Sequence, residues 1–72
     1  MAKRISLAAA RVSANLTQAE LAQKMGISRE YVSAVESGKI DVKPMYLHAL
    51  CYITGFEVDD IFLPTTITQG ED

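Results

Sequence analysis

Cysteine and histidine are nearly missing from this chain of 72 residues, which has one of each. The single cysteine, Cys51, cannot form an internal disulfide, and the paired Cys and His spacings of a zinc site are absent. With one histidine, His48, and no cluster of carboxylates, the sequence offers no nucleophile and base for catalysis. We therefore expect no enzyme activity, no metal and no cofactor, and we interpret Cys51 as a small apolar residue of the core.

Long apolar runs are missing as well. No segment approaches the roughly 18 apolar residues that span a membrane, and no apolar run follows Lys3 and Arg4 as it would in a secretion signal. These absences favour a cytoplasmic protein with no membrane partner. A chain this short makes one domain, whose stability must come from tight helix packing or from a partner.

The charge is divided unevenly along the chain, although the net charge is only −2. Residues 1–43 contain all seven basic residues against four acidic ones, a balance of +3. Residues 44–72 contain no Lys or Arg and five acidic residues, a balance of −5. A basic first part of this kind can face phosphates while the acidic part faces away.

Helix signals dominate the sequence, and strand signals are nearly absent. The alanine-rich stretch 3–14 predicts a first helix. Thr17 and Glu20 form a capping box that predicts a second helix, which is expected to end at Gly26. Within the first helix, periodicity leaves two apolar stripes open as the buried face. One stripe is Leu7, Ala10 and Ala14, and the other is Ile5, Ala8, Ala9 and Val12.

Further helices are predicted from capping residues. Ser28 can cap a third helix that ends at Gly38. Pro44 suits the first position of a fourth helix, which is expected to end at Gly55. The apolar residues assigned to the core face of the fourth helix are Leu47, Leu50 and Cys51, with Thr54 at its end.

The last predicted element is a short fifth helix over 58–62, whose first turn is acidic as the helix dipole favours. Pro64 ends the regular structure. We therefore expect an all-α domain over 1–64, with a short C-terminal tail over 65–72.

The second and third predicted helices form a helix-turn-helix arrangement, because they are short and joined by a tight turn at Gly26. In such an arrangement the first helix crosses the DNA backbone and the second lies in the major groove. Ala22 is small enough to let the two helices approach closely. The residues expected to anchor the pair to the core are Leu21, Met25, Ile27, Val32 and Val35.

The segment 16–29, Leu-Thr-Gln-Ala-Glu-Leu-Ala-Gln-Lys-Met-Gly-Ile-Ser-Arg, resembles the phage-repressor family of the Cro and XRE type. Val32, Glu36, Gly38 and Lys39 continue the pattern, and Gly-Phe-Glu-Val-Asp-Asp-Ile-Phe over 55–62 is similar to the family's closing segment. The resemblance covers about residues 4–63. It implies a compact five-helix, lambda-repressor-like domain that binds an operator as a dimer without a cofactor. It also implies that Leu7, Ala10 and Arg11 point inward.

The resemblance also implies which residues read DNA bases. Arg29 is the foremost candidate, because a guanidinium can bond O6 and N7 of guanine together. Glu30 could accept a hydrogen bond from cytosine N4, or it could merely orient Arg29. Ala34 offers only a methyl group. The residues placed on the groove-facing side of the third helix are Ser28, Arg29, Glu30, Ser33 and Ala34.

Other positions are implied to contact phosphates or to hold the domain together. The phosphate candidates are Thr17, Gln18, Tyr31, Lys39 and Lys43, which would add affinity without reading sequence. Arg11 and Glu36 match an internal ion pair of related repressors. The chain departs from many relatives in the loop after the third helix, where Ile40, Asp41 and Val42 replace basic residues and weaken the expected affinity.

The fourth predicted helix has more apolar residues than its core face can use, so its outer face is poor in charge. We interpret the apolar residues outside the core as the interface of a homodimer, built by the fourth and fifth predicted helices around a two-fold axis. Its residues are Met45, Ala49, Tyr52, Ile53 and Phe56. A larger core that includes the tail is the other interpretation. A two-fold dimer would place two recognition helices about 34 Å apart, which predicts a palindromic operator.

The sequence thus favours a DNA-binding transcriptional regulator, most readily a repressor, that acts as a homodimer on double-stranded DNA. The alternative is a protein-interaction module, such as an antitoxin or anti-repressor, that uses the same fold to bind a protein partner. The acidic second half favours the alternative, whereas Arg29 and the lysines favour DNA. A steep loss of DNA affinity with salt would separate the two.

Overall fold

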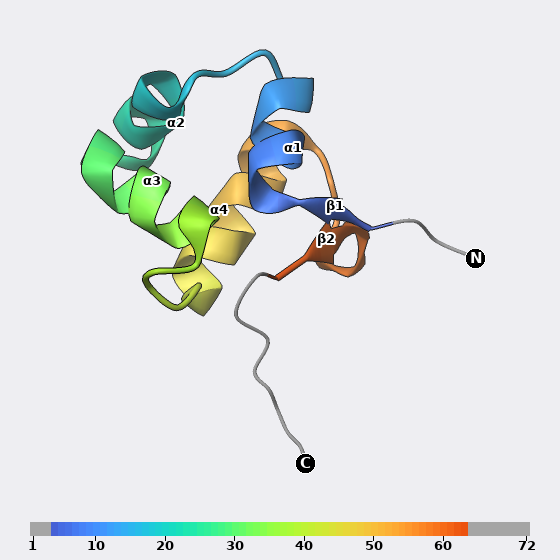
Figure 1. Ribbon diagram of the computed structural model, residues 1–72. Coiled ribbons are helices and arrows are strands. Elements are labelled where there is room, and N and C mark those ends of the chain that lie inside the picture. The colour runs from blue at the N-terminus through green and yellow to red at the C-terminus, as the bar shows by residue number, and fades with distance from the viewer. Residues whose placement is uncertain (1–3, 64–72) are drawn as a thin grey trace.

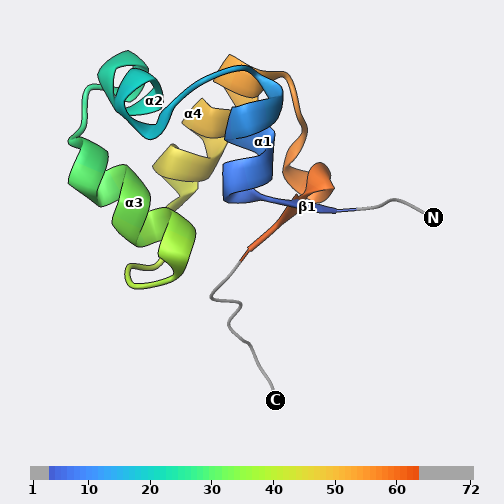
Figure 2. The ribbon, with the colours of Figure 1, turned by 45° about the horizontal axis from the view of Figure 1, so that its top comes forward.

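The computed structural model describes residues 4–63, and the predicted tail over 65–72 lies outside this range. Four helices form the domain: α1 (Leu7–Ser13), α2 (Gln18–Met25), α3 (Arg29–Ser37) and α4 (Pro44–Thr54). Two short strands, β1 (Ile5–Ser6) and β2 (Ile61–Phe62), pair with each other. Both views place α2 and α3 on one side of the molecule and the strands on the other, with α1 and α4 between them (Figures 1 and 2).

The first helix begins at Leu7, later than the predicted range. Ser6 is extended and caps the helix, because its hydroxyl accepts a hydrogen bond from the backbone N–H of Ala9 at 3.0 Å. Lys3 lies outside the described residues, and Ile5 and Ser6 belong to β1. Leu7 and Ala10 are fully buried, which decides between the two apolar stripes of this helix.

The caps of the middle helices confirm the sequence prediction. Thr17 and Glu20 form the capping box of α2, and Gly26 ends this helix in the left-handed conformation, with φ of 74°. Ser28 caps α3, and its hydroxyl accepts from the backbone N–H of Tyr31 at 3.0 Å. Pro44 stands in the first turn of α4, where a backbone N–H would have no acceptor within the helix, so proline loses no hydrogen bond there.

The predicted fifth helix over 58–62 is not found. Its place is taken by a single 3-10 turn, η1 (Val58–Asp60), and by strand β2. The turn is closed by Asp60, whose carboxylate accepts from the backbone N–H of Glu57 at 3.0 Å. The chain then extends because Ile61 enters the core and pairs in parallel with Ile5 of β1.

The core lies where the four helices meet, and β2 adds one residue to it. Its ten buried apolar residues come from every helix and from β2: Leu7, Ala10, Leu21, Ala22, Val32, Val35, Tyr46, Leu47, Leu50 and Ile61. Cys51 is only half-buried and packs against this cluster. Tyr46 was not among the predicted core residues. The described residues contain no helix that is long and apolar enough to cross a membrane.

Candidate DNA-binding surface

The turn between α2 and α3 holds the two helices together. The backbone N–H of Ile27 donates to the carbonyl of Ala22 at 3.0 Å, so the chain reverses directly after Gly26. Ala22 is buried, and a larger side chain there would separate the helices. Leu21 and Val32 anchor the pair in the core. The second and third helices therefore form one unit, with α3 along the outer edge of the molecule (Figures 1 and 2).

The outward face of α3 is polar and open. Its residues line a shallow hollow together with the start of the following loop: Arg29, Glu30, Ser33, Ala34, Ser37 and Lys39. Five of these six were predicted to contact DNA. Ser37 was not, although it continues the same helix face one turn beyond Ser33.

Arg29 stands at the N-terminal end of α3, and its side chain is largely exposed. Its guanidinium lies 3.8 Å from the carboxylate of Glu30, and the two side chains are 56% and 79% exposed. A contact this long and exposed holds the guanidinium only weakly. Ser28, directly before Arg29, is exposed and serves as the cap of the helix.

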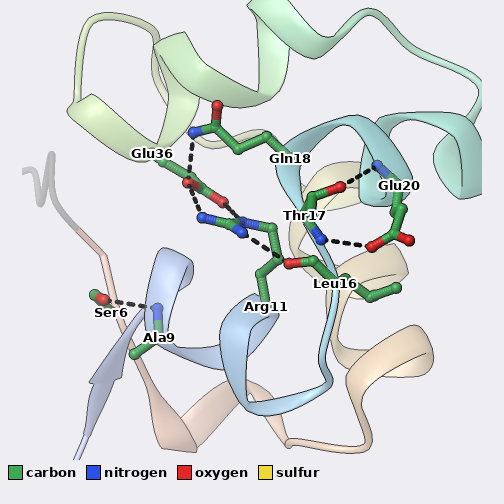
Figure 3. Close-up of polar contacts among 8 residues, drawn as sticks. All are labelled: Ser6, Ala9, Arg11, Leu16, Thr17, Gln18, Glu20 and Glu36. Atoms are coloured by element: carbon green, nitrogen blue, oxygen red, sulfur yellow. Dashed lines mark hydrogen bonds and ion pairs between the residues drawn. The ribbon is translucent and has the colours of Figure 1, made fainter.

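Two of the predicted phosphate contacts already have partners inside the protein. The hydroxyl of Thr17 accepts from the N–H of Glu20, and the side-chain amide of Gln18 donates to Oε1 of Glu36 at 3.0 Å (Figure 3). Tyr31 is half-buried, and its ring lies 6.1 Å from that of Tyr46. The first turn of α2 still presents backbone N–H groups that have no acceptor within the helix.

The two predicted loop lysines are exposed, but they lie in different surroundings. Lys39 follows the C-cap of α3, where its backbone N–H donates to the carbonyl of Ala34 at 2.9 Å. It shares the hollow with Arg29. Lys43 immediately precedes α4 and borders a second hollow, which is apolar.

An ion pair beneath α3 fixes this helix to the rest of the domain. The guanidinium of Arg11 donates to both carboxylate oxygens of Glu36, at 2.7 and 3.1 Å (Figure 3). It also donates to the carbonyl of Leu16 at 2.8 Å. The side chains are 12% and 6% exposed, so the pair is shielded from solvent. With Gln18 as a third donor, Glu36 links α1, α2 and α3.

Tyr46 is buried beside this network. Within residues 4–63 its hydroxyl makes no hydrogen bond. Burial, and next the negative charge of Glu36, raise the pKa of Tyr46 to about 12. The hydroxyl therefore stays neutral at any physiological pH. Burial also raises the pKa of Cys51, with a further contribution from Asp60, which disfavours a reactive thiolate there.

The predicted interface residues, in α4 and directly after it, fall into two groups. Met45 and Tyr52 project into solvent and are 85% and 91% exposed. Ala49 lies between them and is half-buried. Ile53 and Phe56 pack against the core instead, and Phe56 lies beyond the end of the helix. Among residues 4–63, no three His, Cys, Asp or Glu residues are grouped as a metal site would require.

A compact domain whose recognition helix is held on a preceding helix defines the helix-turn-helix class. The profile of the helix-turn-helix family matches residues 7–61, from the start of α1 to the first residue of β2. The chain therefore belongs to the helix-turn-helix family of the Cro and XRE type. It is also similar to an uncharacterized HTH-type transcriptional regulator of Methanocaldococcus jannaschii. The two are 39% identical over 49 residues, which are 68% of this chain and 74% of the relative.

Proposed function

We propose that this chain is a transcriptional regulator that binds double-stranded DNA sequence-specifically, with α3 in the major groove. The observation that carries the proposal is the exposed polar face of α3, which is held rigidly on α2 and begins with Arg29. In helix-turn-helix proteins the N-terminal residues of the second helix reach the base edges. The family membership and the similarity to an HTH-type transcriptional regulator support the same conclusion.

Arg29 is proposed to read a guanine. Its guanidinium is exposed and held only by the long contact with Glu30, so two of its N–H groups can turn toward O6 and N7 of the base. Glu30 is proposed to accept from a cytosine or to orient Arg29. Ser28, Ser33 and Ala34 complete the base-facing set, because they lie on or beside the same face.

The phosphate contacts are proposed to flank this helix. Lys39 shares the hollow with Arg29, and Lys43 extends the basic border toward α4. Because the side chains of Thr17 and Gln18 are engaged internally, we propose that the start of α2 contributes its backbone N–H groups to a phosphate. The hydroxyl of Tyr31 is proposed to reach a phosphate at the border of the second hollow.

We further propose that the protein acts in the cytoplasm as a homodimer on a palindromic operator. A two-fold dimer presents two copies of α3 about one DNA turn apart, near 34 Å. Occupying such a site excludes other proteins from the same DNA, which is why we propose repression. The domain is proposed to comprise residues 1–64, followed by the tail over 65–72.

The test is selection of binding sites from a randomised duplex library at two salt concentrations. Arg29→Ala is the informative variant, and Lys24→Ala is its matched control, because Lys24 is an exposed base outside the hollow of α3. We expect a palindrome whose half-sites are one turn apart, and we expect Arg29→Ala to lose or relax it. Lys24→Ala should select the same palindrome. Selection of no duplex at low salt would reject the proposal.

A second candidate function is recognition of another protein, as in an antitoxin or anti-repressor. The observation that favours it is the acidic balance of −5 over residues 44–72, together with the exposed apolar side chains of α4. A protein that contacts phosphates releases counterions, so its DNA affinity falls steeply with salt. A flat salt dependence and an unselective library would favour this second function.

A further inference from the structure

The outer face of α4 combines high exposure with a complete lack of charge. No Asp, Glu, Lys or Arg occurs in α4, and its only titratable groups beside Cys51 and the tyrosines belong to His48. Met45, Ala49 and Tyr52 are spaced four and three residues apart, so they lie on one face of the helix. Met45 and Tyr52 are the two most exposed of the large apolar side chains in residues 4–63. Such a face is rarely left to solvent in a small domain.

An apolar hollow of about 300 Å³ lies beside the first half of this face. It is bounded by α4 on one side and by the turn between α2 and α3 on the other. Its apolar walls include Met25, Ile27, Tyr31, Met45 and Ala49, and Lys43 stands at its border. The hollow and the projecting Tyr52 therefore occupy opposite ends of the same helix face.

We propose that a second copy of this chain packs its α4 antiparallel to the first, with the two-fold axis close to Ala49. In this register the partner's Tyr52 enters the hollow beside Met45. By the two-fold symmetry, Tyr52 of the first copy enters the hollow of the second, so the interface has two identical junctions. Position 52 lies seven steps after position 45, which is about 10.5 Å along a helix, so both junctions form at once. This inference rests on the homodimer of the proposed function and specifies its contact and direction.

Three physical arguments support a second copy as the occupant. An interface on a two-fold axis must be self-complementary, and this face has both the projecting ring and the hollow that would receive it. Two identical helices without Lys, Arg, Asp or Glu can also meet without burying an unpaired ion from those side chains. In addition, thioether sulfur packs favourably against aromatic rings, which suits a junction of Met45 with the partner's Tyr52.

The tail of the same chain is a poorer occupant by composition. Residues 64–72 contain one large apolar side chain, Ile67, and no aromatic residue. A single isoleucine cannot fill the hollow and also cover Tyr52. The proposed contact is small compared with the roughly 1,600 Å² of a standard interface, so we expect a weak dimer that depends on concentration.

The test is a charge exchange between the two positions that the register brings together. Met45→Lys and Tyr52→Glu are made as separate variants, and association is measured by sedimentation in the absence of DNA. In the homodimer of either single variant, both junctions contain the introduced charge. We therefore expect this homodimer to be at least about tenfold weaker than that of the parent protein. In an equimolar mixture, one junction places the introduced lysine against the introduced glutamate, while the other junction is native. We therefore expect the mixture to dimerise at least about tenfold more tightly than either variant alone.

Matched controls keep this result interpretable. Both side chains are at least 85% exposed, so the variants should retain the thermal unfolding midpoint of the parent protein. Val12→Lys alters an exposed apolar residue of α1 and should leave association unchanged. A parallel arrangement would bring each position against itself, and mixing would then also relieve the contact between like charges. The double variant Met45→Lys/Tyr52→Glu separates the two arrangements, because the antiparallel register pairs opposite charges at both junctions and should dimerise, whereas a parallel one joins like charges at both and should not. Absence of restoration, or a parent protein that is monomeric at every concentration, would overturn the inference.

The same data separate this inference from the proposed function. Sedimentation is performed without DNA, so a chain that selects a palindrome but shows no restoration contradicts only the proposed register. A chain that shows restoration but selects no duplex contradicts only the DNA-binding function. In that second case, the dimer would remain an established property of α4.

Discussion

Arg11 and Glu36 lie 25 positions apart and form a shielded ion pair with two hydrogen bonds, at 2.7 and 3.1 Å. Glu36 stands in the last turn of α3, so this pair joins α3 to α1. Arg29 and Glu30 form the contrasting pair, which is exposed, long and placed at the other end of the same helix. The first pair sets the position of α3, and the second leaves both of its side chains exposed to solvent.

Removing the charge of Glu36 should destabilise the domain strongly. Glu36→Gln leaves the buried guanidinium of Arg11 without a counterion, and we expect a loss of about 3 kcal/mol in the free energy of unfolding. Glu30→Gln is the control, and its effect should stay within about 0.5 kcal/mol. Urea unfolding measures both. Equal losses for the two variants would mean that the ion pair does not hold α3.

Tyr46→Phe should stabilise the domain by about 1 kcal/mol, because it removes a buried hydroxyl that makes no hydrogen bond within residues 4–63. The variant should also respond less to alkali. The folded pKa of Tyr46, about 12, lies above its ordinary value of 10.0, so the unfolded chain releases this proton first. The part of the free energy of unfolding that depends on Tyr46 remaining neutral is complete below pH 10. It is lost as the pH rises through 12.

The measurement is the free energy of unfolding at several pH values. Between pH 10 and 12, Tyr46 should account for a fall of about 2 to 3 kcal/mol in the parent protein, and Tyr46→Phe should lack this part. Tyr52→Phe controls for the exposed tyrosine and should follow the parent. The assignment fails if Tyr46→Phe and the parent lose stability in parallel.

Lys39→Ala should weaken binding of the selected duplex and lower its dependence on salt. A lysine that neutralises one phosphate contributes about 0.9 to the slope of log affinity against log salt concentration. Lys24→Ala, outside the hollow, should leave the slope unchanged. Fluorescence anisotropy of a labelled duplex across a salt series provides the slopes. An unaltered slope for Lys39→Ala would remove this residue from the phosphate contacts.

Gly26→Ala should cost about 1 kcal/mol of stability. The φ of 74° at this position is one that L side chains rarely adopt, whereas the space for a Cβ atom is open, so the loss is conformational. Gly26→Asn should lose less, because asparagine tolerates the left-handed region better than alanine. Thermal unfolding ranks the three proteins. The explanation is wrong if asparagine proves as costly as alanine.

Local signals in the sequence were sufficient to predict α2, α3 and α4. The capping box of Thr17 and Glu20, the cap at Ser28 and the glycine at position 26 act over three or four residues, so their partners are visible in the sequence. The residues of the polar face that begins at Arg29 were predicted from the resemblance to the Cro and XRE family.

Contacts between distant residues were harder to predict. The acidic turn at 58–60 resembled the start of a helix, but Ile61 is held extended by its pairing with Ile5. Nothing in the sequence indicated that the side-chain amide of Gln18 would donate a hydrogen bond to Glu36. Tyr46 was missed in the core because a hydroxyl makes tyrosine ambiguous in an apolar pattern. In each case the structure depends on contacts with residues that are distant in the sequence.

The parallel pairing of Ile5 with Ile61 spans 56 positions and joins two segments that are otherwise far apart in sequence. Closing so long a loop costs entropy that no short-range contact recovers, so this pairing is expected to form after α2 and α3 have met. Until Ile61 has been synthesised, the inner side of α1 lacks one of its neighbours. The helix-turn-helix unit can therefore form early on the ribosome, whereas completion of the core has to wait for β2.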